Sequence, residues 1–294
     1  MIDADALVAI SVSMSAPRDL HDRGLSDLHL RFVFTELVRH VLAAGGCIAY
    51  GGRLDQPADD QPNFTRVMLD MVSGYRPDLR PDDHRLVNFA AATSWAPDDS
   101  ARRAEFDELT SRYQGRFQVE QCPEWPSQLP AGAGPESRGV LALTSMRERM
   151  AEQCVARVVL GGRLDQYSGR YPGVVEEAMC TTDAHRALYV VGGFGGAGAA
   201  LSAHLMGQQV PELTQQWQDA RSPAVSEVAA LLTGTPYRLD LDADLARALP
   251  PGDWATLRNG LSDADNLRLA ATTDTDEVVA LVLRGLHTVA PAKP

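Results

Sequence analysis

Cysteine, aromatic residues and basic residues, each of which can indicate the class of a protein, are scarce in this sequence. It has four cysteines in 294 residues, and 6% of its residues are aromatic. Lysine and arginine are outnumbered, 27 against 39 aspartates and glutamates, which gives a formal net charge of −12. Such a chain has no general field that attracts nucleic-acid phosphates, so we expect no nucleic-acid partner. A small anionic ligand remains compatible with this charge, because one arginine and a helix N-terminus act over short distances.

Long apolar runs are missing as well. No stretch approaches the roughly 18–20 uninterrupted apolar residues of a membrane span, and the first residues lack the basic segment of a signal peptide. The cysteines show neither a CxxC pair nor a metal-site spacing with histidine, which favours free thiols; they are Cys47, Cys122, Cys154 and Cys180. We therefore expect a cytoplasmic protein with no membrane partner, no metal and no required cofactor.

Short apolar runs alternate with amphipathic stretches over the first two thirds of the chain. This pattern predicts an α/β fold, a Rossmann-like doubly wound and mainly parallel sheet with a helical C-terminal extension. Strands are expected at Ala6–Val12, Cys47–Tyr50, Arg85–Ala90, Ala156–Leu160 and Ala187–Val191. Helices are expected at Leu28–Ala44, Asn63–Val72, Ala101–Arg112, Val140–Cys154, Val174–Thr181 and Ala197–Met206. Residues from about 95 to 135 are expected to be less regular.

The end of the chain has few strand signals and five segments with helical periodicity. These segments are Val225–Leu232, Ala243–Leu249, Trp254–Asn259, Asp263–Ala270 and Thr275–Leu286. We place the ligand-binding domain at residues 1–210 and the helical extension, packed on it, at residues 211–294.

One hexapeptide, GGRLDQ, occurs twice, at Gly51–Gln56 and at Gly161–Gln166. Each copy follows an expected strand, but the flanking sequences differ, so the pattern does not indicate a tandem duplication. Paired glycines let a ligand or another backbone come close, and the arginine lies where the strand ends. The alternative is two tight turns, each holding an Arg–Asp pair.

Glycines, serines and arginines gather at the expected carboxyl ends of the strands, where open α/β sheets bind ligands. Free amides, hydroxyls and arginines suit phosphate and ribose better than an apolar ligand. For Ser13 and Ser15, capping of a helix or turn explains the sequence as well as ligand contact does. The candidate ligand-binding residues from this set are Ser13, Ser15, Gly51, Gly52, Arg53, Gly161, Gly162, Arg163, Gly193, Gly195 and Gly196.

Residues 193–198 spell GxGxxG between an expected strand and helix, but they come late in the chain. A dinucleotide fingerprint lies in the first βαβ unit, with an acidic residue ending the next strand. We therefore favour an anion-binding helix start over NAD binding. A GxxxxGK[ST] nucleotide-binding loop is also missing.

The segment YSGRYPGVVEEA, residues 167–178, adds Arg170, Gly173 and two carboxylates to the candidate site. Pro172 suits a first helical turn, and Glu176 and Glu177 there interact well with the helix dipole. That alone explains both carboxylates as capping residues. In the functional interpretation one of them accepts a ribose hydroxyl or assists glycosidic chemistry.

Taken in order, ISVSMS, AYGGRLDQ…NFT, GGRLDQYSGRYPGVVEEA and VVGGFGGAGA resemble the SLOG superfamily over residues 6–206. This Rossmann-like group includes lysine-decarboxylase-like phosphoribohydrolases, DprA-type proteins and nucleotide sensors of bacterial conflict systems. The resemblance implies a nucleotide or ADP-ribose-like ligand at the carboxyl edge of the sheet. It implicates Ser13, Ser15, Gly51, Gly52, Arg53, Gly161, Gly162, Arg163, Gly173, Glu177 and Gly193.

The hydrolytic branch of that superfamily carries PGGxGTxxE, whereas this chain has PGVVEE at residues 172–177. Glu177 matches the terminal glutamate, but the Gly-Thr turn that holds a 5′-phosphate is missing. The leading hypothesis is therefore a nucleotide-derivative sensor of a bacterial conflict or defence system. The alternative is a nucleotide N-glycosidase in which Glu177 and Arg163 are catalytic, so the sequence leaves open whether the chain is an enzyme. A third is a scaffold acting through assembly. We expect a homo-oligomer and an effector protein as partners.

Overall fold

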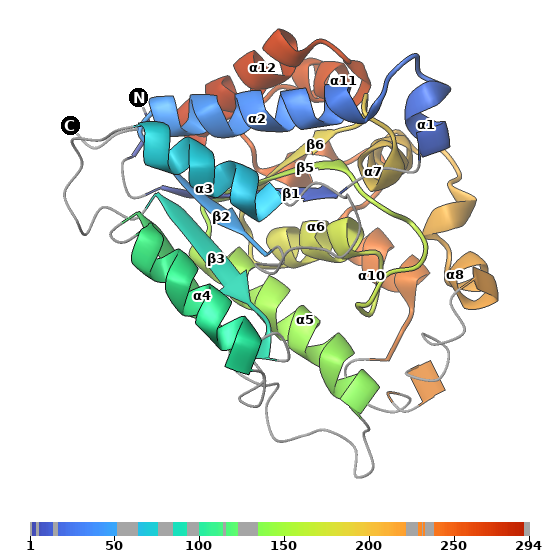
Figure 1. Cartoon of the computed structure of the whole chain (residues 1–294). Coiled ribbons are helices and arrows are strands. Elements are labelled where there is room, and N and C mark those ends of the chain that lie inside the picture. The colour runs from blue at the N-terminus through green and yellow to red at the C-terminus, as the bar shows by residue number, and fades with distance from the viewer. Residues whose placement is uncertain are drawn as a thin grey trace.

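The computed structural model describes residues 2–3, 6–13, 17–51, 64–75, 85–92, 100–113, 116–122, 135–221, 229–230, 232 and 238–290. Its centre is a six-stranded sheet in the order β4-β3-β2-β1-β5-β6 (Figure 1). All neighbouring strands run parallel. The strands are β1 (Leu7–Ser13), β2 (Cys47–Tyr50), β3 (Leu86–Ala90), β4 (Phe117–Gln121), β5 (Ala156–Gly161) and β6 (Ala187–Val191). The expected Rossmann-like α/β fold is confirmed.

Helices cover both faces of this sheet (Figure 1). They are α1 (Pro17–His21), α2 (Asp27–Ala43), α3 (Phe64–Tyr75), α4 (Ser100–Arg112), α5 (Pro135–Gln153), α6 (Gly173–Asp183), α7 (Gly196–Leu205), α8 (Gln215–Arg221), α10 (Leu241–Ala248), α11 (Asp263–Ala271) and α12 (Thr275–Val289). None of these described helices combines the length and the apolar character that a membrane crossing needs.

The strand order creates a switch point between β1 and β5. From β1 the chain adds β2, β3 and β4 on one side, then returns to place β5 and β6 on the other. The parallel register pairs Ser13 with Gly161, so the two strands end at the same level. Open α/β sheets bind ligands outside the carboxyl ends of the strands where the strand order reverses, which in this fold is between β1 and β5.

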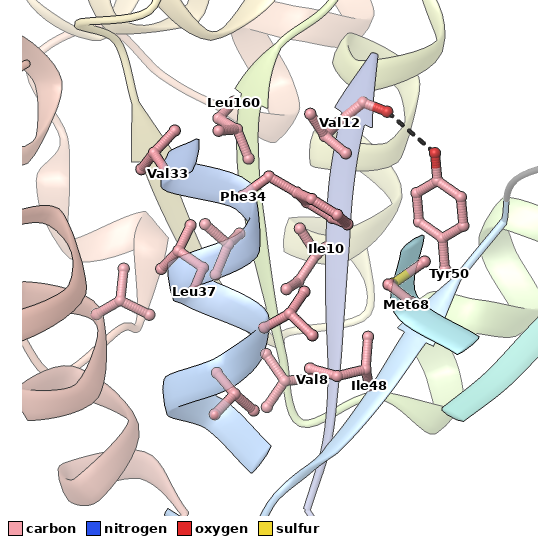
Figure 2. Close-up of a cluster of buried hydrophobic side chains, with 14 of the residues drawn as sticks. Val8, Ile10, Val12, Val33, Phe34, Leu37, Ile48, Tyr50, Met68 and Leu160 are labelled. Carbon is pink, nitrogen blue, oxygen red and sulfur yellow. Dashed lines mark hydrogen bonds between the residues drawn. The ribbon is translucent and has the colours of Figure 1, made fainter. Parts of the chain in front are cut away.

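The helix α2 is the main cover of one face. Its buried residues recur at helical spacing and form an apolar stripe; they are Leu30, Val33, Phe34, Leu37, Val38, Val41 and Leu42. Phe34 extends from α2 toward β1 and lies near Ile10 (Figure 2). Its ring also meets the ring of Phe64 edge-on, with centroids 4.8 Å apart. Burying each side chain of this size contributes about 1.5–3 kcal/mol, so α2 is fixed by packing.

Tyr50 closes this core at the carboxyl end of β2. Its hydroxyl donates to the carbonyl of Val12, at 3.3 Å, across the neighbouring strand (Figure 2). Burial raises the pKa of this phenol well above its ordinary value, with the nearby Glu177 carboxylate adding to the shift. Tyr50 is therefore a neutral hydrogen-bond donor that joins two strand ends.

On the other face, α5, α6, α7 and α10 form two further apolar clusters with the sheet. Met146 and Met150 of α5 cover the small residues Ala9 and Ala49. The four cysteines are free, as expected, and three of them are buried; these are Cys47, Cys122 and Cys154. Burial raises the pKa of the Cys154 thiol to about 12, so it is protonated at neutral pH.

The helical C-terminal extension shares both cores with the sheet. Val278, Val282 and Leu286 of α12 are buried in the cluster that contains α2, and α12 lies beside α2 in Figure 1. At the sheet edge, the Asn259 side-chain amide donates to the carbonyl of Leu188 on β6, at 2.9 Å. In return, the Tyr189 hydroxyl donates to the backbone carbonyl of Asn259, at 2.9 Å. The tail thus covers the edge strand.

The strand β4 and the short helices α1 and α8 are not among the ranges predicted from the sequence. The strand β4 lies where irregular structure was expected, because FQVEQ alternates and has only Phe117 fully buried. As an edge strand it needs one partner, and it presents Glu120 to Arg149 of α5 at 3.3 Å. The helix α1 is too short to show periodicity. The helix expected at Val225–Leu232 lies almost entirely outside the described residues.

We expect Leu286→Ala to lower the free energy of unfolding of the whole chain by about 2–5 kcal/mol, because it leaves a cavity in the core shared by α12 and α2. Denaturant unfolding followed by both circular dichroism and tryptophan fluorescence measures this. The control is Leu267→Ala on α11, whose residue is 44% exposed and should change stability by no more than about 0.5 kcal/mol. If the helical tail unfolded at a lower denaturant concentration than the sheet, so that the two probes gave different transitions, a shared core would be contradicted.

Candidate functional site

The carboxyl end of β5 is shaped by two glycines in the left-handed region. Gly161 has φ +60° and Gly162 has φ +102°. A Cβ atom on Gly162 would lie 2.7 Å from Val174 of α6 and 3.1 Å from Ala197 of α7. The carbonyl of Gly162 accepts a hydrogen bond from the amide of Ala197, at 2.9 Å. The glycine pair therefore brings the starts of α6 and α7 against the strand end.

Arg163 follows this turn and is exposed to solvent. It has no hydrogen bond or ion pair with any residue in the described part of the chain. The Arg–Asp pair that would explain the second GGRLDQ copy as a plain turn is therefore not formed between Arg163 and Asp165. Arg163 therefore presents its guanidinium to solvent at the switch point of the sheet.

The carboxylate of Glu176 binds two side chains of helix α5. Its side chain is 3% exposed and accepts hydrogen bonds from the Thr144 hydroxyl and from the Arg147 guanidinium. Burial alone would lower the pKa of Arg147, but the charges of Glu176 and Glu177 outweigh it and hold that pKa above its ordinary value. Glu176 and Arg147 thus form a buried ion pair.

The carboxylate of Glu177 faces the sheet. Its Oε2 accepts a hydrogen bond from Nη1 of Arg157 on β5, at 2.9 Å, and its Oε1 lies 3.6 Å from Nε of Arg147. The Arg157 side chain is 1% exposed. It also donates to the hydroxyls of Ser11 on β1 and Thr181 on α6, at 2.6 and 2.7 Å. We call Arg147, Arg157, Glu176 and Glu177 the charge network.

The charge network was only half visible in the sequence. The two glutamates were singled out, and one of them was expected to face the crevice, but both are paired because the arginines approach from different elements. Neither arginine was predicted. The available signal is Arg157 itself, since a charged residue inside the apolar run ARVVL requires a buried partner.

The β5–α6 loop, residues 162–172, lies directly on this network. A Cβ atom on Gly169 would lie 2.2 Å from Nη1 of Arg147 and 2.9 Å from Oε2 of Glu176. A Cβ atom on Gly173 would lie 3.0 Å from Nη2 of Arg147. The glycine at 169 is therefore required by a close approach of the loop to the ion pair.

Arg170, predicted to bind ligand, is engaged with the tail. Its Nη2 lies 3.6 Å from Oδ2 of Asp244 on α10, and its side chain is 11% exposed. The guanidinium also stacks on the ring of Tyr171, 5.2 Å from the ring centre. Of the two arginines at this strand end, Arg163 is the one presented to solvent.

The glycines after β6 have different structural reasons. A Cβ atom on Gly193 would lie 1.9 Å from the carbonyl oxygen of Thr272, at the end of α11. One on Gly198 would lie 2.6 Å from the carbonyl oxygen of Val191, so this glycine permits close helix–strand packing. Gly195 and Gly196 have φ values of +74° and +60°, which L side chains rarely adopt. These contacts account for the GxGxxG spacing without a dinucleotide.

Most of the predicted ligand-binding residues come together at the carboxyl edge of the sheet. Ser13 is the last residue of β1, and Gly51 directly follows β2. A Cβ atom on Gly51 would lie 2.9 Å from Met146. Ser15, Gly52 and Arg53 lie outside the described residues. Within the described part of the chain, no group of three histidine, cysteine, aspartate or glutamate side chains is arranged to hold a metal ion.

A family model described as SLOG cluster2 matches residues 4–269. The chain belongs to the SLOG cluster2 family. The match starts before β1 and ends within α11, so it covers the sheet, the β5–α6 loop and most of the helical tail of this SLOG cluster2 protein. A comparison with curated proteins gives no match.

We expect Glu176→Ala to lower the free energy of unfolding by about 3–5 kcal/mol, because it leaves the buried Arg147 charge without its main partner. The double variant Arg147→Met, Glu176→Leu should recover most of this loss, since it removes both charges and keeps the volume. Denaturant unfolding of the single and double variants measures the difference. A loss below about 1 kcal/mol in the single variant would show that the pair is not buried as described.

Proposed function

We propose that this SLOG cluster2 protein binds a nucleotide or a nucleotide-derived, ADP-ribose-like molecule at the carboxyl ends of β1 and β5. The family and the Rossmann-like fold together indicate a nucleotide-related function. The observation that supports this position best is Arg163, an exposed arginine without a partner among the described residues, directly after the Gly161–Gly162 turn. A phosphate group suits this combination of a guanidinium and nearby helix starts.

We further propose that the ligand is sensed and not hydrolysed, as part of a bacterial conflict or defence system with an effector protein. The sequence lacks the Gly-Thr turn of the hydrolytic branch, and each of its two carboxylates is paired with an arginine. Glu176 pairs with Arg147, and Glu177 pairs with Arg157. A hydrolase would need a carboxylate available to the ribose.

The second candidate function is an N-glycosidase that acts on a nucleotide through Glu177. It is favoured by one observation, the exposure of the Glu177 side chain, which is 15% against 3% for Glu176. In that case Glu177 would orient a ribose hydroxyl or stabilise positive charge at the anomeric carbon.

We expect Arg163→Ala to weaken binding of the retained nucleotide roughly 10- to 150-fold, because a charge-assisted hydrogen bond to phosphate is worth about 1.5–3 kcal/mol. The purified chain is offered nucleoside monophosphates, NAD, ADP-ribose and cyclic ADP-ribose isomers, and calorimetry then measures the affinity of the compound retained. The control is Arg186→Ala, an exposed arginine at the opposite end of the sheet, just before β6.

Unchanged affinity in Arg163→Ala would overturn the proposed position of the ligand. If the wild-type chain retains none of these compounds and forms a fixed oligomer, a scaffold that acts through assembly replaces the sensor.

A further inference from the structure

The loop that carries Arg163 has little support of its own. Residues 162–172 contain no helix or strand, and Gln166 adopts a left-handed φ of 51°, which is unusual for a residue with a side chain. A loop of this kind holds one conformation only when neighbouring elements fix it. Gly169 packs on Arg147 and Glu176, and further contacts that fix the two ends of the loop come from the helical tail.

The first anchor is Gln218 of α8, beside Arg163. This residue is 1% exposed. Its side-chain amide donates to the carbonyl of Leu164, at 2.9 Å, and to the carbonyl of Glu212, at 2.7 Å. One buried amide group therefore connects the residue after Arg163 to the first turn of the tail.

The second anchor is Asp244 of α10, at the other end of the loop. Its Oδ2 accepts a hydrogen bond from the Tyr171 hydroxyl, at 2.7 Å, and lies 3.6 Å from Nη2 of Arg170. The same hydroxyl accepts a hydrogen bond from the Asp240 amide, at 3.0 Å. Tyr171 is 2% exposed, whereas the Asp244 side chain is 30% exposed, so the tyrosine is enclosed and the carboxylate lies at the rim.

The two anchors belong to one connected unit. The Gln215 amide of α8 donates to Oδ2 of Asp242 on α10, at 2.8 Å. The Leu241 amide of α10 donates to Oε1 of Gln215, at 3.0 Å. Because α8 and α10 hold each other, a shift of either changes both ends of the β5–α6 loop.

We propose that Gln218 and Asp244 are positioning residues of the ligand site and that the tail sets the place of Arg163. The loop is held at Leu164 and at Tyr171, next to Arg163 and next to the start of α6. Tail and ligand site are then coupled in both directions, since linkage between two equilibria is reciprocal. An anion bound by Arg163 stabilises the arrangement of α8 and α10, and loss of that arrangement weakens binding. The role in binding rests on the proposed function.

The test combines hydrogen exchange of the free protein with binding of ADP-ribose as the probe. Asp244→Asn removes the charge that holds Tyr171 and Arg170, and Tyr171→Phe removes the hydroxyl with little change of volume. We expect faster exchange in residues 163–172 for both variants and about tenfold weaker binding of ADP-ribose. The matched control is Asp183→Asn, which removes the α6–α10 ion pair with Arg247 at the far end of α6.

The two parts of the test separate the two proposals. Unchanged exchange in the loop in both variants overturns the positioning role, whatever the ligand. Faster exchange with unchanged affinity for ADP-ribose shows that the anchors do not serve the ligand site and also overturns it. If the wild-type chain does not bind ADP-ribose but the loop exchanges faster in Asp244→Asn and not in Asp183→Asn, the anchoring is supported and ADP-ribose is excluded as the ligand.

Discussion

The arrangement of the site depends on the burial of one guanidinium group, that of Arg157. A charge enclosed in the centre of a protein is costly unless an opposite charge and hydrogen-bond partners compensate for it. Arg157 therefore takes three partners from two elements, Ser11 on β1 and both Thr181 and the Glu177 carboxylate on α6. Because α6 supplies two of these groups, its position along β5 is fixed. The position of α6 in turn fixes where the β5–α6 loop begins and ends.

The second arginine extends this constraint to α5 and to the loop. Arg147 pairs with Glu176 and lies under Gly169, where any larger residue would collide with the guanidinium. The segment PGVVEEA is thus used for structure, with its carboxylates turned to arginines. Arg163 is outside the charge network and faces solvent. The buried charges fix the sheet, α5 and α6 relative to one another, and the exposed Arg163 is the charge that we propose binds the ligand. This division is the basis for proposing binding without cleavage.

The fold was largely readable from the sequence, because most of its strands are short apolar runs and three of them, β2, β5 and β6, run into glycines. The predicted ranges of β2 and β6 agree with the structure residue for residue. The edge strand β4 was missed because a strand with one partner needs only one apolar face. The helices of the tail were predicted in type from their periodicity, and their packing against the sheet was expected.

The site was predictable only in part, since a sequence shows which residues end the strands but not what reaches them from elsewhere. The location of Arg163 and its two glycines at the end of a strand was predicted, and their role in binding remains a proposal. The pairing of Glu176 and Glu177 with Arg147 and Arg157 was not, because no spacing relates α5, β5 and α6. Gln218 and Asp244 are ordinary polar residues in their helices, and only the folded loop gives them a role.

We propose above all that Glu177 has a structural role in the charge network and that the protein releases its ligand chemically unchanged. The most direct measurement is mass spectrometry of the small molecules before and after long incubation of the purified chain with nucleoside monophosphates, NAD and ADP-ribose. The account predicts one compound enriched on the protein and recovered without change. Free base together with ribose phosphate, formed by the wild-type chain and lost in Glu177→Gln, would contradict it and make the protein an N-glycosidase.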